Sequence, residues 1–137
     1  SCNIKTLNLI PNVMAAQQAS EAGCNETVFV RDGYVTECSH SNISMVKDGV
    51  FITHPLDNLI LPGTERKHII RWCGELGIPV KERAFTLEEL YTADEILVTS
   101  TSHPSMRAME LNQKAVGMKN PELIQKLRDK YLNEIGK

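Results

Sequence analysis

The sequence predicts one mixed α/β domain, and three observations lead to this fold class. The chain has 137 residues, a length typical of a single domain that buries roughly two-thirds of the surface of its unfolded chain. Two Asp-Gly pairs each lie between short apolar segments, which is the signal of a β-hairpin with a two-residue turn. Amphipathic segments with helix-capping residues are interspersed with these strands, and we find no repeat or linker. We therefore expect residues 1–137 to form one domain.

The first half of the chain is expected to hold a helix followed by two hairpins. Residues 11–22 carry apolar side chains at helical spacing, and Gly23 is suited to a C-terminal cap. The Asp-Gly pairs at 32–33 and 48–49 are the predicted hairpin turns. The strands of these hairpins are predicted at residues 27–30, 34–36, 42–46 and 50–53.

The second half is expected to alternate helices and strands. Gly77 suits the end of a helix, and Asn120 suits the start of another. Thr86 followed three residues later by Glu89 is a capping-box signature. Helices are predicted at residues 65–76, at 87–92 and from 121 onward, and strands at 78–84 and 96–99.

The composition points to a small-molecule ligand. Lys and Arg total 15 against 17 Asp and Glu, so the charge balance gives no reason to expect a nucleic acid or an anionic membrane as partner. The four cysteines lack a Cys-x-x-Cys pair or metal-binding spacing, so we expect free thiols and no metal site. We find neither an apolar run of about 18 residues nor a secretory leader, and we expect a cytoplasmic protein.

Lys5 is the first candidate for chemistry. It lies between Ile4 and Leu7 in a segment that we expect to be extended and partly buried. A desolvated lysine amine is more readily deprotonated and can form a Schiff base with an aldehyde cofactor. Because most lysines are solvated surface charges, a surface position is the alternative.

Glu37 is the second candidate, at the end of the first hairpin and shortly before Ser39, Ser41 and Asn42. A carboxylate that faces a pyridine nitrogen keeps this nitrogen protonated and makes the ring an electron sink. The neighbouring hydroxyl and amide groups can hydrogen-bond such a carboxylate or a ring substituent. Since Ser and Asn are also common turn residues, a plain surface turn is the alternative.

Two further segments suit a phosphate group. Residues 61–66, Leu-Pro-Gly-Thr-Glu-Arg, open a predicted helix, whose free N–H groups and dipole attract anions. Residues 99–102, Thr-Ser-Thr-Ser, follow an apolar strand and offer several hydroxyls. A helix-start turn and a strand-end loop without a ligand would look much the same.

The order and spacing of these motifs resemble the fold-type IV pyridoxal-phosphate enzymes. This family comprises D-amino-acid aminotransferases, which the chain resembles most, branched-chain aminotransferases and aminodeoxychorismate lyases. The resemblance extends over about residues 2–111. The motifs that carry it are Ile4-Lys5-Thr6-Leu7-Asn8-Leu9, Gly23-Cys24, Val35-Thr36-Glu37, Ser41-Asn42, Thr53-His54-Pro55, Asn58, Ile60-Leu61 and Val98-Thr99-Ser100-Thr101.

The resemblance implies a barrel-like sheet with surrounding helices and pyridoxal 5′-phosphate as cofactor. By this resemblance Lys5 is the Schiff-base lysine that moves a proton between the substrate and the cofactor. Glu37, supported by Ser41, would pair with the pyridine nitrogen. Other residues would pack on the ring or hold the phosphate: Leu61, Thr64, Glu65, Ser100 and Thr101.

The chain departs from the family pattern in two segments. Glu65 stands where the family commonly has a hydroxyl residue, and its negative charge is expected to weaken phosphate binding. After Thr101, the family's Glu-Ile-x-Pro-Val is replaced by Pro-Ser-Met-Arg-Ala at residues 104–108, near the expected substrate pocket. Arg107 or His103 is a possible contact for a substrate carboxylate, and exposed loop and strand positions are the alternative.

Family members carry a smaller domain before the lysine, whereas this sequence starts close to Lys5. The resemblance thus implies the C-terminal, cofactor-binding domain of a homodimeric enzyme. Little activity is expected from it alone, because positioning of the substrate supplies a large part of catalysis. The expected reaction is transamination between a D-amino acid such as D-alanine and a 2-oxo acid such as 2-oxoglutarate. Branched-chain transamination, the aminodeoxychorismate lyase reaction and a noncatalytic binding or assembly module are the alternatives.

Overall fold

The computed structural model describes residues 2–9, 24–38, 41–55, 64–99 and 105–134. The predicted helix over residues 11–22 lies outside these ranges. The described elements, in chain order, are β1 Cys2–Asn8, β2 Cys24–Arg31, β3 Tyr34–Cys38, β4 Asn42–Lys47, β5 Val50–Thr53, α1 Thr64–Leu76, β6 Val80–Glu82, β7 Phe85–Thr86, α2 Leu87–Thr92, β8 Glu95–Thr99, β9 Met106–Leu111, β10 Lys114–Ala115 and α3 Pro121–Glu134.

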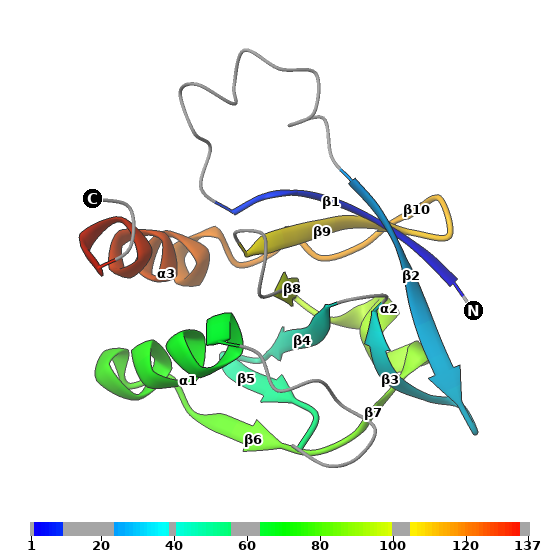
Figure 1. The fold of residues 1–137 in the computed structure, drawn as a ribbon, viewed down its shortest axis with the longest axis horizontal. Helices are drawn as coiled ribbons and strands as arrows, with labels where there is room; N and C mark the ends of the chain where they lie inside the picture. Colours follow the sequence, from blue (N-terminus) through cyan, green and yellow to red (C-terminus); the bar gives the residue numbers. More distant parts are fainter. Residues whose placement is uncertain (1, 10–23, 39–40, 56–63, 100–104, 135–137) are drawn as a thin grey trace.

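The strands form one curled sheet (Figure 1). Their order is β6-β5-β4-β8-β9-β1-β2-β3-β7, with β10 paired to β9. Most neighbours are antiparallel, and β5 and β6 are parallel. Strand β3 also contacts β4 across the curl, although four other strands separate them in the sheet. The predicted mixed α/β fold with a barrel-like sheet is therefore confirmed, in the form of a half-barrel.

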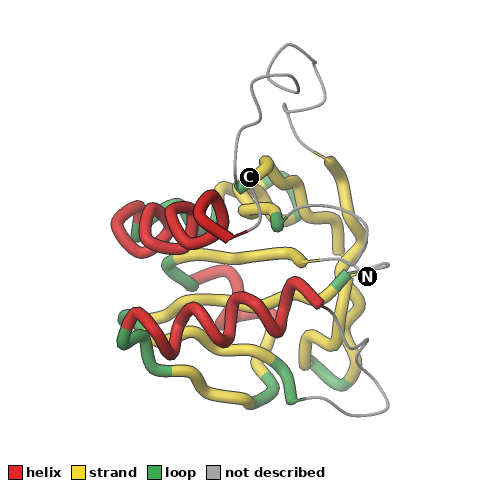
Figure 2. Tube along the Cα trace, turned by 60° about the vertical axis from the view of Figure 1, so that its left-hand side comes forward, coloured by secondary structure: helices red, strands yellow, loops and turns green. Residues whose placement is uncertain are grey.

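Apolar side chains form a core on each face of the sheet. The first core lies inside the curl and joins distant strands, such as β3 through Val35 and β4 through Ile43. The second core lies between the sheet and helices α1 and α3, which lie on the same side of it (Figure 2). At its centre, Trp72 of α1 is fully buried and packs edge-on against Tyr131 of α3 at a ring separation of 5.8 Å.

Both predicted hairpins are confirmed. Asp32 and Gly33 have φ angles of 54° and 83°, and Asp48 and Gly49 have φ angles of 53° and 78°. A type I′ turn requires positive φ at both central residues, and its twist matches that of the flanking strands. The Asp-Gly pairs therefore fix the register of β2 with β3 and of β4 with β5.

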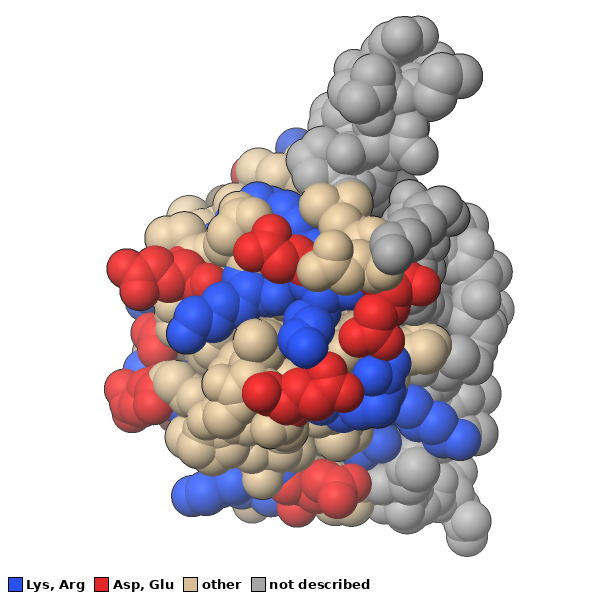
Figure 3. Space-filling model, turned by 90° about the vertical axis from the view of Figure 1, so that its left-hand side faces the viewer, with Lys and Arg blue, Asp and Glu red and all other residues tan. Residues whose placement is uncertain are grey.

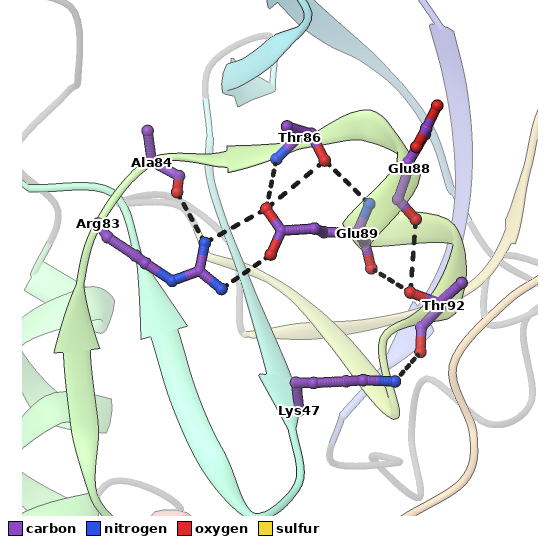
Figure 4. A network of polar contacts seen from close by, with 7 residues as sticks. All are labelled: Lys47, Arg83, Ala84, Thr86, Glu88, Glu89 and Thr92. Atoms are coloured by element: carbon purple, nitrogen blue, oxygen red, sulfur yellow. Dashed lines mark hydrogen bonds and ion pairs between the residues drawn. The ribbon is translucent and has the colours of Figure 1, made fainter.

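The helix caps predicted at Thr86 and Asn120 are also present in the structure. The Thr86 hydroxyl accepts a hydrogen bond from the Glu89 backbone N–H at 3.1 Å, and a Glu89 carboxylate oxygen accepts one from the Thr86 backbone N–H at 3.0 Å (Figure 4). This is the predicted capping box of α2. At the start of α3, the Asn120 side chain accepts a hydrogen bond from the Leu123 backbone N–H at 3.1 Å.

Two parts of the sheet differ from the sequence prediction. Strands β9 and β10 were not predicted, although β9 lies between β8 and β1 in the interior of the sheet. The predicted strand at residues 78–84 is shorter in the structure, where β6 covers only Val80–Glu82 and pairs with β5. A second short strand that was not predicted, β7 at Phe85–Thr86, follows it and pairs with β3 at the opposite edge. Between the two strands, Arg83 donates its backbone N–H to the Thr53 oxygen at the end of β5 and its side chain to Glu89 of α2.

Acidic and basic side chains are interspersed on the face at the α1 and α3 end of the molecule (Figure 3). Ion pairs join the two helices, with Arg71 bound to Glu134 and Lys130 bound to Glu75, each at 2.7 Å. No helix among the described residues is long and apolar enough to span a membrane. In the same ranges, no cluster of His, Cys, Asp and Glu side chains could hold a metal ion.

Candidate active site

Lys5 lies in the middle of β1, the strand between β9 and β2. Its Cα is opposite Asn25 of β2 and Glu110 of β9. The residue is half-buried and lines a pocket of about 280 Å³. The other residues that line this pocket are Asn3, Ile4, Glu110 and Gln113. A small ligand in the pocket can therefore reach Lys5.

The register places Lys5 on the face of the sheet that α1 and α3 partly cover. Its neighbour Ile4 belongs to the inner core, and successive residues of a strand alternate between the two faces. Leu7 shares the face of Lys5 and is opposite Arg107, which is in turn opposite Leu97. Since Leu97 packs in the core beneath the helices, Lys5 lies on that same face.

Two buried polar residues meet where β4 begins and β8 ends. Asn42 and Thr99 are Cα partners across these strands and are only 4% and 2% exposed. Thr99 is two residues from Leu97 on β8, so Thr99 and its partner Asn42 lie on the same face of the sheet as Lys5. Among the described residues, neither the Asn42 Oδ1 atom nor the Thr99 Oγ1 atom has a hydrogen-bond partner. Both residues lie in motifs noted in the sequence, but only the strand pairing brings them together.

The start of α1 lies beside the end of β5. The Arg66 Nη2 atom donates to the backbone oxygen of His54 at 2.8 Å and to a Glu82 carboxylate oxygen at 3.1 Å. Arg66 is 3% exposed, and its Nε atom has no partner in the described part of the chain. This edge of the sheet therefore combines a cationic residue, a helix N-terminus and buried polar groups.

The structure describes the remaining predicted site residues only in part. Ser41 is buried immediately before β4. Glu37 lies in β3 opposite Phe29 of β2, and Thr64 and Glu65 are the first two residues of α1. Only the backbones of these last three residues are described. Leu61, Ser100 and Thr101 lie outside the described residues.

Arg107 is not available for a substrate carboxylate, which corrects one of the sequence hypotheses. Its Nε and Nη2 atoms donate to the two carboxylate oxygens of Glu95 at 2.7 and 2.6 Å. Glu95 is fully buried, and the Arg107 side chain is 14% exposed, so Arg107 is also not an exposed strand residue. His103, the other residue considered, lies outside the described residues.

The pattern of the amino-transferase class IV family matches residues 1–111. This match covers most of the chain and includes Lys5 and all strands from β1 to β9. The chain therefore belongs to the class IV aminotransferase family.

Relatives within this family include D-alanine aminotransferases. The protein of that name from Listeria monocytogenes serotype 4b is 43% identical over 136 residues, which cover 98% of this chain and 47% of the relative. The one from Bacillus licheniformis is 38% identical over 141 residues, covering 99% of this chain and 50% of the relative. The chain thus spans about half the length of the curated relatives it matches.

Solved structures of branched-chain aminotransferases share the fold. The enzyme from Thermoproteus uzoniensis, solved with norvaline, is 35% identical with a TM-score of 0.71, and the match covers 87% of this chain and 40% of that one. The enzyme from T.th., solved with pyridoxamine 5′-phosphate, is 30% identical with a TM-score of 0.72, covering 88% and 40%. These likenesses confirm the fold-type IV architecture.

The described residues fit the cofactor that the family implies, pyridoxal 5′-phosphate. Lys5 places an amine at a pocket. Asn42, Thr99 and Arg66 have buried polar atoms without partners in the described chain, and a buried polar group is unfavourable until it is hydrogen-bonded. A polar ligand bound beside the start of α1 would supply the missing partners.

Proposed function

We propose that the chain is the cofactor-binding half of a pyridoxal-phosphate-dependent aminotransferase, which transfers an amino group between a D-amino acid such as D-alanine and a 2-oxo acid such as 2-oxoglutarate. The observation that carries this proposal is the position of Lys5. It lies at a pocket and on the same face of the sheet as the unpartnered polar atoms of Asn42 and Thr99. Membership of the class IV family supports the reaction type.

Each predicted site residue has a role in this proposal. The cofactor supplies a reactive aldehyde and an electron-withdrawing ring. Lys5 holds the cofactor through its amine and, when this amine is released, takes the proton from the α-carbon of the substrate. Glu37, held by Ser41, stabilises the protonated ring nitrogen. The ring and phosphate contacts are assigned to Leu61, Thr64, the Glu65 backbone, Ser100 and Thr101.

The direction of α1 suits the phosphate. Thr64 begins the helix, so the free N–H groups of the first turn and the positive end of the helix dipole lie at this edge of the sheet. Arg66, whose guanidinium is buried there, adds positive charge. The carboxylate of Glu65 opposes this field, and we expect weaker cofactor binding than with an uncharged residue at that position.

The choice of D-alanine as the example rests on the relatives of that name at 43% and 38% identity. Branched-chain transamination is the second candidate, because the branched-chain enzymes described above share the fold at 35% and 30% identity. The lyase reaction and a noncatalytic module are less favoured, since these relatives and structural neighbours are all named aminotransferases.

We also propose that the 137-residue chain has little activity by itself and that the active enzyme is a homodimer. The relatives are about twice as long, and catalysis depends strongly on how the substrate is positioned. Turnover by the chain alone at a rate typical of an aminotransferase would contradict the first part. Light scattering on the active enzyme tests the second part.

A chimera tests the proposed reaction. Residues 1–137 would replace the matching half of the Bacillus licheniformis D-alanine aminotransferase, which aligns over 141 residues. We expect the chimera to convert D-alanine and 2-oxoglutarate, and the same chimera with Lys5→Ala to be inactive. A preference for L-leucine over D-alanine would assign the branched-chain reaction. A folded chimera that retains cofactor but transfers no amino group would favour the noncatalytic module.

A further inference from the structure

Glu110 of β9 lies directly opposite Lys5 of β1. The adjacent pair on the same two strands, Ile4 and Leu111, belongs to the core inside the curl. Because successive residues of a strand point to opposite faces of a sheet, Lys5 and Glu110 both point to the outer face. Residues opposite each other in an antiparallel pair have Cβ atoms about 4.5–5.5 Å apart, so the two side chains are neighbours.

A β-bulge sets this pairing. Lys5 is opposite Glu110 and Thr6 is opposite Ala108, so Met109 has no partner on β1. Without this extra residue, the register of Thr6 with Ala108 would put the apolar Met109 opposite Lys5. Bulges are frequent beside active sites, where they re-aim a side chain. Here the bulge brings a carboxylate next to the candidate nucleophile.

Lys5 and Glu110 share one pocket and have no other partner in the described part of the chain. Both side chains are half-buried, and both line the pocket of about 280 Å³. Among the described residues, neither side chain forms a hydrogen bond or an ion pair. The Lys5 amine is therefore free to move, and the Glu110 carboxylate is within the reach of its long side chain.

The other cationic side chains of β9 and β10 are held elsewhere. Arg107 of β9 donates to both carboxylate oxygens of Glu95. Lys114 of β10 lies over the Tyr91 ring, with its Nζ atom 5.7 Å from the ring centre. Lys5 is therefore the cation that these strands and β1 leave for the carboxylate.

On the basis of the proposed function, we infer that Glu110 is a positioning residue for Lys5 and that its carboxylate holds the ammonium that forms when Lys5 takes a proton from the substrate. In this step the bond between the α-carbon and its hydrogen breaks, and its electron pair stays with the carbon. The proton forms a new bond to the Lys5 Nζ atom. A carboxylate beside this nitrogen stabilises the charged form and keeps the nitrogen near the reacting carbon.

The ligand-free chain tests the charge coupling without cofactor chemistry. The 137-residue chain would be treated with acetic anhydride at neutral pH, and modification of each lysine would be followed by mass spectrometry. Only the uncharged amine reacts, so Glu110→Gln should speed the modification of Lys5, relative to the other lysines, about two- to fivefold, as for a partly exposed charge pair. Glu110→Asp should stay close to the wild type. Glu122→Gln, which removes an exposed carboxylate of α3, is the matched control and should not change Lys5.

The chimera with the Bacillus licheniformis enzyme tests the catalytic consequence. We expect Glu110→Gln to lower its kcat for D-alanine about tenfold, as for a lost hydrogen bond to a charged group, with an unchanged KM. The isotope effect with α-deuterated D-alanine should rise, because proton transfer becomes slower, and Glu110→Asp should restore most of the rate.

Equal modification of Lys5 in the wild type and in Glu110→Gln would overturn the inference. An unchanged kcat and isotope effect in the Glu110→Gln chimera would overturn its catalytic part. If Lys5 modification responds as expected but a folded chimera that retains cofactor transfers no amino group, the proposed function fails while the coupling of Lys5 to Glu110 stands.

Discussion

Arg107 and Glu95 form a buried, bidentate ion pair that joins the neighbouring strands β9 and β8. The two hydrogen bonds, from Nε and Nη2, are 2.7 and 2.6 Å long. The second oxygen of Glu95 also accepts the backbone N–H of Asn120 at 2.8 Å, immediately before α3. The pair therefore connects the interior of the sheet to the start of the last helix.

Arg107→Met should destabilise the fold strongly. The substitution leaves the Glu95 carboxylate buried without its cationic partner, which costs about 3–5 kcal/mol. Urea unfolding measures the change, and Arg71→Met provides a control because the Arg71 side chain is 46% exposed and its pairs should contribute little. Normal stability combined with a selective loss of affinity for carboxylate substrates would restore Arg107 as a substrate contact.

Two glycine substitutions should have opposite effects. Gly33 has a φ of 83° in the first hairpin turn. Gly33→Ala should therefore destabilise the fold by about 1–2 kcal/mol, because a residue with a Cβ is strained in this conformation. Gly74 lies in α1, and no atom lies within 4 Å of a Cβ added there, so Gly74→Ala should stabilise the chain by roughly 0.5–1 kcal/mol. Equal and small effects in chemical denaturation would argue against the type I′ turn.

Trp72→Ala should remove the central contact between α1, α3 and the sheet. The indole is fully buried and donates its N–H to Glu134 of α3 at 2.9 Å. Truncation of a buried aromatic residue costs about 3–5 kcal/mol. Because Trp72 is the only tryptophan in the sequence, the loss of stability in the variant is best followed by circular dichroism. A cost below about 1 kcal/mol would mean that α3 is not packed on α1 as described.

The capping box of α2 should make stability depend on pH. Hydrogen bonds from Arg83, and then from the Thr86 N–H, lower the pKa of the Glu89 carboxyl below its ordinary value of 4.5. A carboxyl with a lowered pKa in the folded state stabilises the fold above the ordinary value, and this stabilisation is lost as the pH falls through the folded pKa.

Glu89→Gln isolates this effect because it keeps an oxygen for the Thr86 N–H and removes the charge (Figure 4). We expect the variant to lose less stability than the wild type on acidification below about pH 4.5. The difference should be less than about 1 kcal/mol, because both side chains of the Arg83–Glu89 pair are partly exposed. Identical pH profiles in urea titrations would argue against this role of Glu89.

The local signals in the sequence predicted most of the fold, since turns and caps depend on neighbouring residues. The Asp-Gly turns and the Thr86 capping box are examples. Strand β9 was not predicted, because Arg107 and Glu110 interrupt its apolar pattern. Arg107 is compatible with an interior strand only through Glu95, a partner that is distant in sequence and close in the folded sheet.

In the candidate site too, some features follow from local sequence and others depend on how distant strands pair. The motif around Lys5 predicted the candidate nucleophile, because the motif is continuous in the sequence. The pairing of Asn42 with Thr99 depends on the register of β4 with β8 and on the absence of a partner among the described residues. Neither property can be obtained from the sequence, since both arise from how distant strands meet.

Covalent trapping shows whether Lys5 holds pyridoxal phosphate. The chain and the Lys5→Ala variant would be titrated with pyridoxal phosphate, reduced with borohydride, digested and mapped by mass spectrometry. We expect saturable labelling of the peptide that contains Lys5 and loss of this labelling in Lys5→Ala. Labelling spread over surface lysines, equal in the two proteins, would contradict it.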